Sequence, residues 1–215
     1  MGRAISVVAL ACDGKEHVLD LRGRSRLAPF FDPVAVALSK ARLTPTVVTM
    51  LGLIVTIGGA VLIANGWYLP GASVAAAGAL LDALDGPLAR HQGTASIRGA
   101  FIDTMSDRFG EVAVWVGLAF SLRDNGTALM RCLLALAFSL LTPYVRAKAE
   151  SWGAEGRGGW MGRAERMILA LLGIGVAGIG GLGLTVLRPM LWVFVILGAL
   201  TVGQRIRRTW QQLPS

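Results

Sequence analysis

Residues 47–64 read VVTMLGLIVTIGGAVLIA, a stretch without a single charged side chain. A helix needs about 20 mainly apolar residues to cross a bilayer, and this stretch is close to that length. The rest of the chain agrees, because 54% of its 215 residues are hydrophobic, 16% are charged and the mean hydropathy is +0.60. A water-soluble domain of this size carries more charge. We therefore predict an all-α integral membrane protein.

Further apolar runs follow the first. They comprise residues 66–81, 112–122, 132–145, 167–187 and 189–204. Together with the first run they predict six transmembrane helices, of which only the first and the fifth reach full length without polar ends. Residues 27–41 mix apolar and polar side chains in the manner of an amphipathic helix at the membrane surface. The proline that follows, Pro45, is suited to open the first span.

The remaining features of the chain organisation concern its start and its glycines. Residues 1–26 hold only a short apolar stretch and no cleavage site of a signal peptide, so we predict a poorly ordered extension before one membrane domain, residues 27–215. Glycines in the fifth run are spaced so that helix backbones can approach closely. These are Gly173, Gly175, Gly178, Gly180, Gly181 and Gly183.

The net charge of +8 has a simple explanation in this arrangement. Eighteen of the 21 lysines and arginines fall before the first span, in every second connection, or after the last span. Cytoplasmic loops are enriched in basic residues, so both termini are predicted on the cytoplasmic side of the cell membrane. The excess also suits anionic membrane lipids. It does not indicate nucleic acid, which would require a basic face on a soluble module.

Four acidic residues stand where charge near lipid is costly, and such residues are functional by default. They are Asp82, Asp85, Asp103 and Asp107. The first two are three residues apart and the last two are four apart, so on helices each pair projects from one face. Carboxylates gathered by two antiparallel helices repel one another unless cations neutralise them. Ligands that are all oxygen favour Mg²⁺, Mn²⁺ or Ca²⁺ over zinc.

The residues between the aspartates point to a phosphate-bearing ligand. Gly86 leaves room for a ligand to approach the backbone, and Gly99 offers a second such place. Ala89 keeps the helix surface low, and Arg90 has a guanidinium that binds phosphate in a bidentate manner. As a purely structural alternative, the aspartates would cap helices and pair with nearby arginines, which explains any one aspartate better than all four together.

Read together, residues 82–107 form the pattern Asp-x2-Asp-Gly-x2-Ala-Arg-x8-Gly-x3-Asp-x3-Asp. This pattern resembles the complete signature of the CDP-alcohol phosphotransferase family, and the resemblance extends from about Leu43 to Trp210. It implies a homodimer with six transmembrane helices in each chain. It also implies transfer of a phosphatidyl group from CDP-diacylglycerol to an alcohol, with release of CMP.

The same resemblance implies roles for individual residues. Two divalent cations, Mg²⁺ or Mn²⁺, would be held by Asp82, Asp85, Asp103 and Asp107. Asp107 would also take the proton from the incoming hydroxyl. CDP would be bound by Gly86, Ala89, Arg90 and Gly99.

Residues outside the signature resemble the actinobacterial phosphatidylinositol phosphate synthases. The matching segments are 144–150, 163–166 and 204–205. This resemblance implies inositol 1-phosphate as the acceptor, with its phosphate bound by Arg146, Lys148, Arg166 and Arg205. Glycerol 3-phosphate is the alternative acceptor. The basic residues are also what the positive-inside rule places at helix ends.

Two other classes of membrane protein fit the sequence less well. A cation transporter usually has ligands near the middle of the bilayer and repeated halves, and the sequence has neither. A non-catalytic lipid-binding scaffold would explain the basic ends but not Gly86, Ala89 and Gly99. CMP release from CDP-diacylglycerol separates the enzyme from both.

Overall fold

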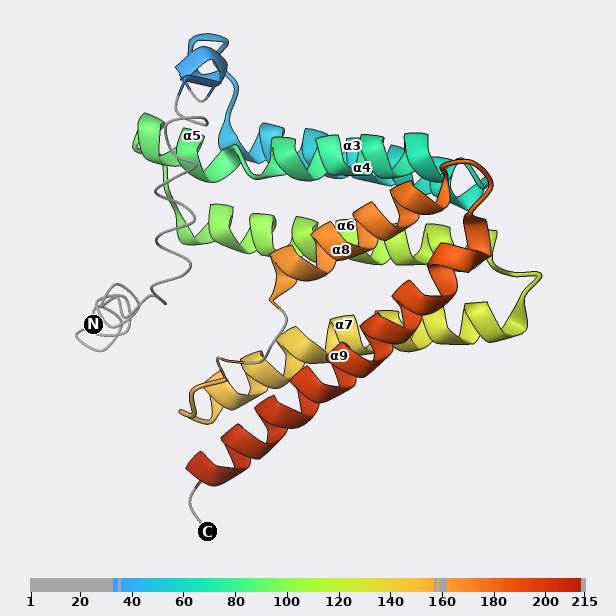
Figure 1. Ribbon diagram of the computed structural model, residues 1–215. Coiled ribbons are helices and arrows are strands. Elements are labelled where there is room, and N and C mark those ends of the chain that lie inside the picture. Colours follow the sequence, from blue (N-terminus) through green and yellow to red (C-terminus); the bar gives the residue numbers. More distant parts are fainter. Residues whose placement is uncertain (1–32, 35, 157, 159–161, 214–215) are drawn as a thin grey trace.

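The computed structural model describes residues 33–34, 36–156, 158 and 162–213, and among these it contains helices and no strand (Figure 1). The all-α prediction is confirmed for this part of the chain. The helices are α3 Pro45–Ala64, α4 Tyr68–Asp82, α5 Asp85–Gln92, α6 Ile97–Ser121, α7 Gly126–Ser151, α8 Arg163–Ala177 and α9 Gly183–Gln212.

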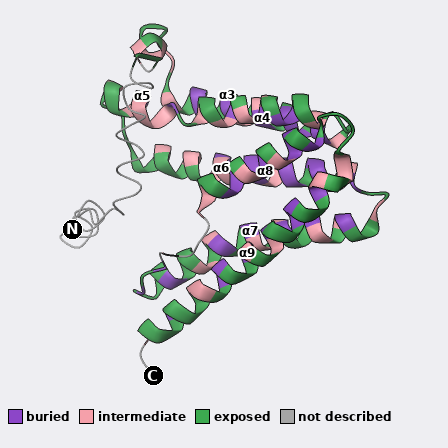
Figure 2. Ribbon diagram, in the orientation of Figure 1, coloured by how far each residue is buried: buried purple, intermediate pink, exposed green. Residues whose placement is uncertain are grey.

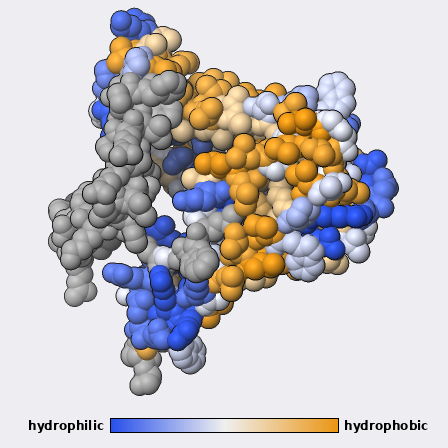
Figure 3. All heavy atoms as spheres, in the orientation of Figure 1, coloured by the Kyte–Doolittle hydropathy of each residue, from blue (hydrophilic) through white to orange (hydrophobic). Residues whose placement is uncertain are grey.

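The helices run back and forth between two ends of the molecule (Figure 1). The starts of α3, α6 and α8 lie at the same end as α5 and the last turns of α4, α7 and α9; we call this the site end. An apolar band separates the site end from the opposite end (Figure 3).

Among the described residues, four segments are long and apolar enough to cross a membrane, which makes the chain a multi-pass membrane protein. They are Pro45–Ala64, Tyr68–Gln92, Gly126–Ser151 and Gly183–Gln212. α6 falls outside this set because its first half carries charged side chains, and α8 falls outside it because it has 15 residues. The expectation of six spans is therefore met only in part.

Helix starts follow the polar residues in the sequence. Pro45 stands in the first turn of α3, as predicted, and the Thr44 side chain accepts a hydrogen bond from the backbone N–H of Val47. Ser96 caps α6 in the same way, since its hydroxyl accepts from the Gly99 N–H at 3.1 Å. Such caps satisfy backbone donors that have no partner within the helix.

The predicted boundary between the fifth and sixth spans was wrong. The sequence placed it between the runs 167–187 and 189–204, but α8 ends at Ala177 and α9 already begins at Gly183. Gly180, Gly181 and Gly183 have φ angles of +59°, +77° and +32°, which glycine adopts without strain. These glycines turn the chain, and the apolar run is therefore divided between two helices.

The remaining glycines of that run differ in how closely their neighbours approach. A Cβ atom on Gly178 would overlap the backbone of Leu69 on α4, so this glycine allows a close backbone approach, as predicted. A Cβ atom on Gly173 would overlap the Met190 side chain, and one on Gly175 would stand at an ordinary contact distance of 3.6 Å from Ala72. The prediction is confirmed for Gly178 and wrong for the three glycines that form the turn.

A close helix contact also lies between α3 and α4, at glycines for which the sequence had predicted no role. A Cβ atom on Gly59 would lie 2.5 Å from the Ala75 nitrogen, and one on Gly52 would lie 2.8 Å from the Gly78 carbonyl oxygen. The backbones of α3 and α4 therefore touch along their length. This contact fixes the start of α3 beside the end of α4.

The main apolar core is formed by buried residues of α3, α4, α6, α7, α8 and α9 (Figure 2). Trp115 on α6 meets Phe194 on α9 edge to face, with ring centroids 4.8 Å apart, and Leu118 and Ile174 are fully buried beside them. Of the predicted surface helix, residues 33–34 and 36–40 are helical. Its first part and the whole predicted extension 1–26 lie outside the described residues.

Candidate active site

Three carboxylates meet at the site end. Asp82 is the last residue of α4, Asp85 is the first residue of α5, and Asp103 lies two turns into α6. Each offers an oxygen, and these oxygens lie within 4.8 Å of one another. Asp82 Oδ1 is buried and has no hydrogen-bond partner among the described residues. Closely spaced carboxylate oxygens with an unsatisfied buried atom are suited to a divalent cation.

The sequence predicted that Asp82 and Asp85 share one helix, but in the structure they lie on two. Ala83 and Leu84 separate α4 from α5. Pro87 explains the break, since it lacks the N–H that would bond to the carbonyl of residue 83. Both intervening residues keep right-handed backbone angles, so the two aspartates still face the same side.

Thr49 fixes the orientation of Asp85. Its hydroxyl is 2.5 Å from Asp85 Oδ2 and 3.0 Å from the backbone carbonyl oxygen of Pro45. The Thr49 side chain is almost fully buried. Because α3 and α4 are in close backbone contact, this threonine is held beside the start of α5.

Asp107 lies one turn beyond Asp103 on α6 and has a different environment. Its carboxylate lies beside that of Asp82. On its other side it forms an ion pair with Arg163, in the first turn of α8. Asp107 is not part of the three-carboxylate cluster, so the structure brings the four predicted aspartates together as three plus one.

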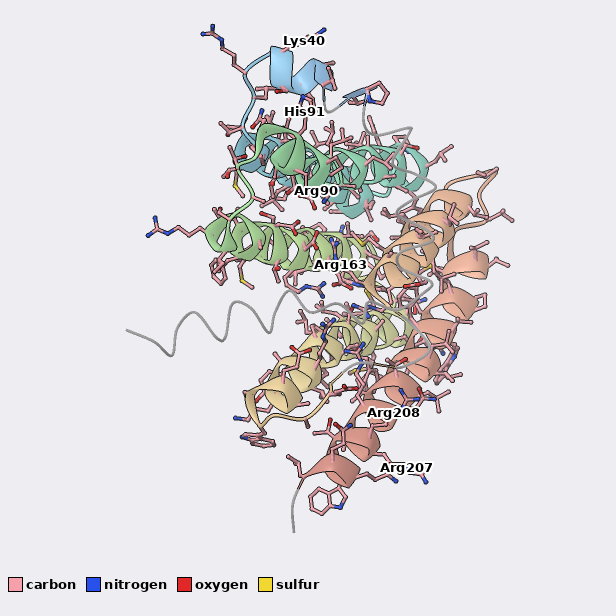
Figure 4. All side chains as sticks on the ribbon, turned by 90° about the vertical axis from the view of Figure 1, so that its left-hand side faces the viewer. Lys40, Arg90, His91, Arg163, Arg207 and Arg208 are labelled. Carbon is pink, nitrogen blue, oxygen red and sulfur yellow. The ribbon has the colours of Figure 1, made fainter. Side chains whose placement is uncertain are left out.

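A small cavity adjoins the pair of Asp82 and Asp107. Arg163 forms part of its polar wall, and its remaining walls are mainly apolar. They comprise Gly52, Leu53, Thr56, Ala79, Ser106, Gly110 and Met167. The cavity thus lies between the carboxylates and the apolar interior of α3, α4, α6 and α8. Figure 4 shows Arg163 beside α6, toward the centre of the site end.

The residues predicted to bind CDP lie around the three-carboxylate cluster with open space beside them. A Cβ atom on Gly86 would approach only Arg90, at 3.4 Å, and one on Gly99 would approach only the Ser96 hydroxyl, at 3.3 Å. No backbone packs against either glycine. Arg90 is exposed and close enough to Asp85 to act on its charge, and Ala89 is half-buried. A ligand can therefore reach this face.

A buried ionic network extends from Asp107 toward α7 and α8. Glu111 is 1% exposed and accepts a hydrogen bond from Arg108 at 2.7 Å. Arg166, 4% exposed, directs its Nε toward Glu111 at 3.3 Å and toward the Ser139 hydroxyl at 3.2 Å. Ser139 itself donates to Glu111. Arg166 is therefore held rigidly, with polar contacts on α6 and α7.

The other basic residues of the predicted acceptor pocket have varied surroundings. Arg205 donates to the backbone carbonyls of Gly158, at 2.7 Å, and Thr142, at 2.8 Å, and the charges of Arg146 and Arg166 act on it. Arg146 pairs with Glu150 at 2.8 Å on its own helix. Three arginines from α7, α8 and α9 thus gather at the site end.

Lys148 does not join this group closely. Its ammonium lies over the ring of Trp152, 4.5 Å from the centroid. Arg207 and Arg208 lie further along α9, toward its C-terminal end (Figure 4). They fit the role of charged residues at a helix end.

Comparison with known proteins identifies the family of this chain. A family model described as CDP-alcohol phosphatidyltransferase matches residues 42–200, well over half of the chain. The chain belongs to this family. It is therefore a transferase, and the aspartate cluster agrees with the divalent metals that these transferases use.

Individual relatives are similar in sequence to this chain over most of their length. Phosphatidylinositol phosphate synthase of Cutibacterium acnes is 36% identical over 197 residues, which cover 85% of this chain and 93% of that protein. Archaetidylinositol phosphate synthase of Methanothermobacter thermautotrophicus is 33% identical over 189 residues, which cover 86% of this chain and 90% of that protein.

Solved structures of related enzymes are similar to this chain in fold. Phosphatidylinositol phosphate synthase of Mycobacterium tuberculosis with CDP-DAG bound aligns with a TM-score of 0.78 and 32% identity, covering 84% of this chain and 93% of that one. The same enzyme in complex with manganese and citrate aligns with a TM-score of 0.79 and 32% identity, covering 84% and 88%.

Three residues of the candidate site were not predicted from the sequence. Glu111 had a signal, because a carboxylate at the start of the run 112–122 needs a buried partner. Thr49 and Arg163 had no comparable signal in the sequence. Each acts through a partner on another helix, and only the packing of the helices shows which one.

Proposed function

We propose that this transferase moves the phosphatidyl group of CDP-diacylglycerol to a hydroxyl of inositol 1-phosphate and releases CMP. The observation that carries the proposal is the position of three arginines, from α7, α8 and α9, at the same end of the molecule as the aspartates of α4, α5 and α6. A phosphorylated acceptor needs such a basic group beside the carboxylates. The inositol phosphate synthases among the relatives support the choice of acceptor.

In this proposal the four aspartates hold two divalent cations. Asp82, Asp85 and Asp103 would form the first site, and Asp107 with Asp82 would form the second. Once bound, the cations neutralise the diphosphate of the CDP-lipid and stabilise the departing CMP. Thr49 keeps Asp85 in the orientation that the first site needs. The unsatisfied Oδ1 of Asp82 fits this role.

The chain's own groups perform the remaining steps. Gly86, Ala89 and Gly99 leave space for CDP, and Arg90 binds one of its phosphates. Asp107 accepts the proton of the attacking hydroxyl, since its carboxylate borders the cavity. The acyl chains lie toward the apolar side of the same end.

The acceptor phosphate binds to Arg146, Arg166 and Arg205, with Lys148 at the edge of the group. Gln204 precedes Arg205 in the sequence, and its Oε1 is buried without a hydrogen-bond partner among the described residues. Such an oxygen accepts hydrogen bonds from the hydroxyls of a polyol. This favours an acceptor that carries both a phosphate and several hydroxyl groups.

The proposal includes the membrane arrangement. Residues 27–215 form one domain in which α3, α4, α6, α7, α8 and α9 all cross the membrane, preceded by a surface helix and a poorly ordered extension. The site end and both termini face the cytoplasm, since most basic residues lie there. The protein acts as a homodimer in the cell membrane.

The test is a CMP-release assay on the purified full chain with CDP-diacylglycerol and Mg²⁺ or Mn²⁺. Inositol 1-phosphate, glycerol 3-phosphate, free inositol and serine are supplied separately, and the lipid product is identified by mass. Product with inositol 1-phosphate alone is the expected result. Product with glycerol 3-phosphate instead would keep the chemistry and replace the acceptor. No CMP with any acceptor would contradict the proposed reaction.

A further inference from the structure

Apart from its contact with Asp107, the positive charge of Arg163 has unfavourable surroundings. It is the first residue of α8, where the positive end of the helix dipole disfavours a cation. Arg163 and Arg166 both act on Arg108 with charge of the same sign. The ion pair with Asp107 is the favourable contact that offsets this repulsion.

The contact between Arg163 and Asp107 is also incomplete. It runs from one guanidinium nitrogen, Nη2, to one carboxylate oxygen. The Nε of Arg163 is buried and has no hydrogen-bond partner among the described residues. A guanidinium can bind a carboxylate or a phosphate through two N–H groups, so Arg163, which lines the cavity, has unused binding capacity.

We propose that Arg163 is a built-in counter-ion for Asp107, which the second divalent cation must displace. The inference rests on the proposed two-cation site. The ion pair of Arg163 is with Asp107, which lies outside the three-carboxylate cluster. The second cation binds between Asp82 and Asp107 only when the guanidinium withdraws.

Withdrawal gives Arg163 a second partner. Arg163 lines the cavity beside the carboxylates, so a phosphate arriving there can take the place that Asp107 held. Cation and phosphate then favour each other's binding, because both require the same movement of one side chain. Binding free energies coupled in this way are reciprocal.

Binding of Mn²⁺ to the purified full chain tests the inference without any turnover. Free Mn²⁺ is measured by electron paramagnetic resonance during a titration, and the wild type is expected to show a tighter and a weaker class of site. In Arg163→Gln the weaker class should tighten by roughly tenfold while the tighter class stays the same. Arg163→Lys should remain close to the wild type.

The matched control is Arg98→Gln, since Arg98 is an exposed arginine in the first turn of α6. It should leave both classes unchanged. Identical titrations for Arg163→Gln and the wild type, or equal weakening of both classes, would overturn the counter-ion role while leaving the metal site intact. A wild type that binds no Mn²⁺ would overturn the proposed site and the counter-ion together.

Discussion

The hydroxyl of Thr49 on α3 lies 2.5 Å from Oδ2 of Asp85 on α5, and this bond joins residues 36 positions apart. It exists because glycines let the backbones of α3 and α4 touch. The contact that assembles two helices therefore also orients a carboxylate of the site.

Replacing Thr49 with valine should raise the Mn²⁺ concentration needed for half-maximal CMP release by about tenfold or more. Hydrogen bonds that orient metal ligands have effects of this size on metal affinity. Valine keeps the shape of threonine and removes only the hydroxyl. Thr49→Ser, which keeps the hydroxyl, should stay near the wild type, and an unchanged metal requirement in Thr49→Val would contradict the orienting role.

Asp107→Asn should reduce CMP release by about a hundredfold or more, because an amide does not accept the proton of the attacking hydroxyl. The protein should still insert into membranes and bind CDP. Asp124→Asn is the control, since Asp124 is highly exposed at the opposite end of the molecule. Undiminished turnover in Asp107→Asn would show that another group takes the proton.

The sequence predicted the helical fold well where one residue decides the local structure. Pro45 marked the start of α3, and apolar length identified the four segments that qualify as membrane spans among the described residues, although it predicted six. It failed at residues 178–182, because hydropathy does not distinguish a glycine turn from a glycine-rich helix. Positive φ angles at Gly180 and Gly181 are set by the chain reversal, which the apolar pattern does not record.

The aspartate spacing located the cluster but not its division. A pattern of fixed intervals placed Asp82, Asp85 and Asp103 together even though the helix is interrupted between Asp82 and Asp85. The pairing of Asp107 with Arg163 depends on how α8 packs near α6. Contacts between residues so far apart in the sequence have no local signal in a single chain.

Arg205→Ala should raise the KM for inositol 1-phosphate by about tenfold or more and leave the KM for CDP-diacylglycerol near its wild-type value. The Arg205 guanidinium is a strong partner for a phosphomonoester, and it lies near Arg146 and Arg166. Steady-state kinetics with each substrate varied in turn gives both constants.

The control for Arg205 is its neighbour Arg207, which is exposed on α9. Arg207→Ala should change neither KM. Arg205 also holds the carbonyls of Thr142 and Gly158, so the melting temperature of each variant is recorded. An equal rise in both KM values would indicate that Arg205 serves the structure and not the acceptor.

Glu111→Gln should destabilise the protein by about 3 to 5 kcal/mol, the usual effect of removing one partner from a buried ion pair. The change leaves Arg166, which is 4% exposed, without the charge that neutralises it. Thermal unfolding in one detergent measures the loss. Glu150→Gln removes an exposed carboxylate from its pair with Arg146 and should change the midpoint little.

Gly58 and Gly59 are adjacent in α3 and face opposite environments, which makes them a matched pair. A Cβ atom on Gly59 would lie 2.5 Å from the Ala75 nitrogen of α4, whereas one on Gly58 would meet nothing within 4 Å. Gly59→Leu should therefore force α3 and α4 apart and lower stability by about 1 to 3 kcal/mol or more. Gly58→Leu should be tolerated.

The separation of α3 from α4 should also reach the site, because Thr49 is on the first helix and Asp85 follows the second. Gly59→Leu is accordingly expected to raise the Mn²⁺ requirement in the same direction as Thr49→Val, although it lies far from any carboxylate. Thermal midpoints and metal-dependent CMP release for the two glycine variants decide the matter. Equal behaviour of Gly58→Leu and Gly59→Leu would show that the close contact of α3 with α4 does not hold the site together.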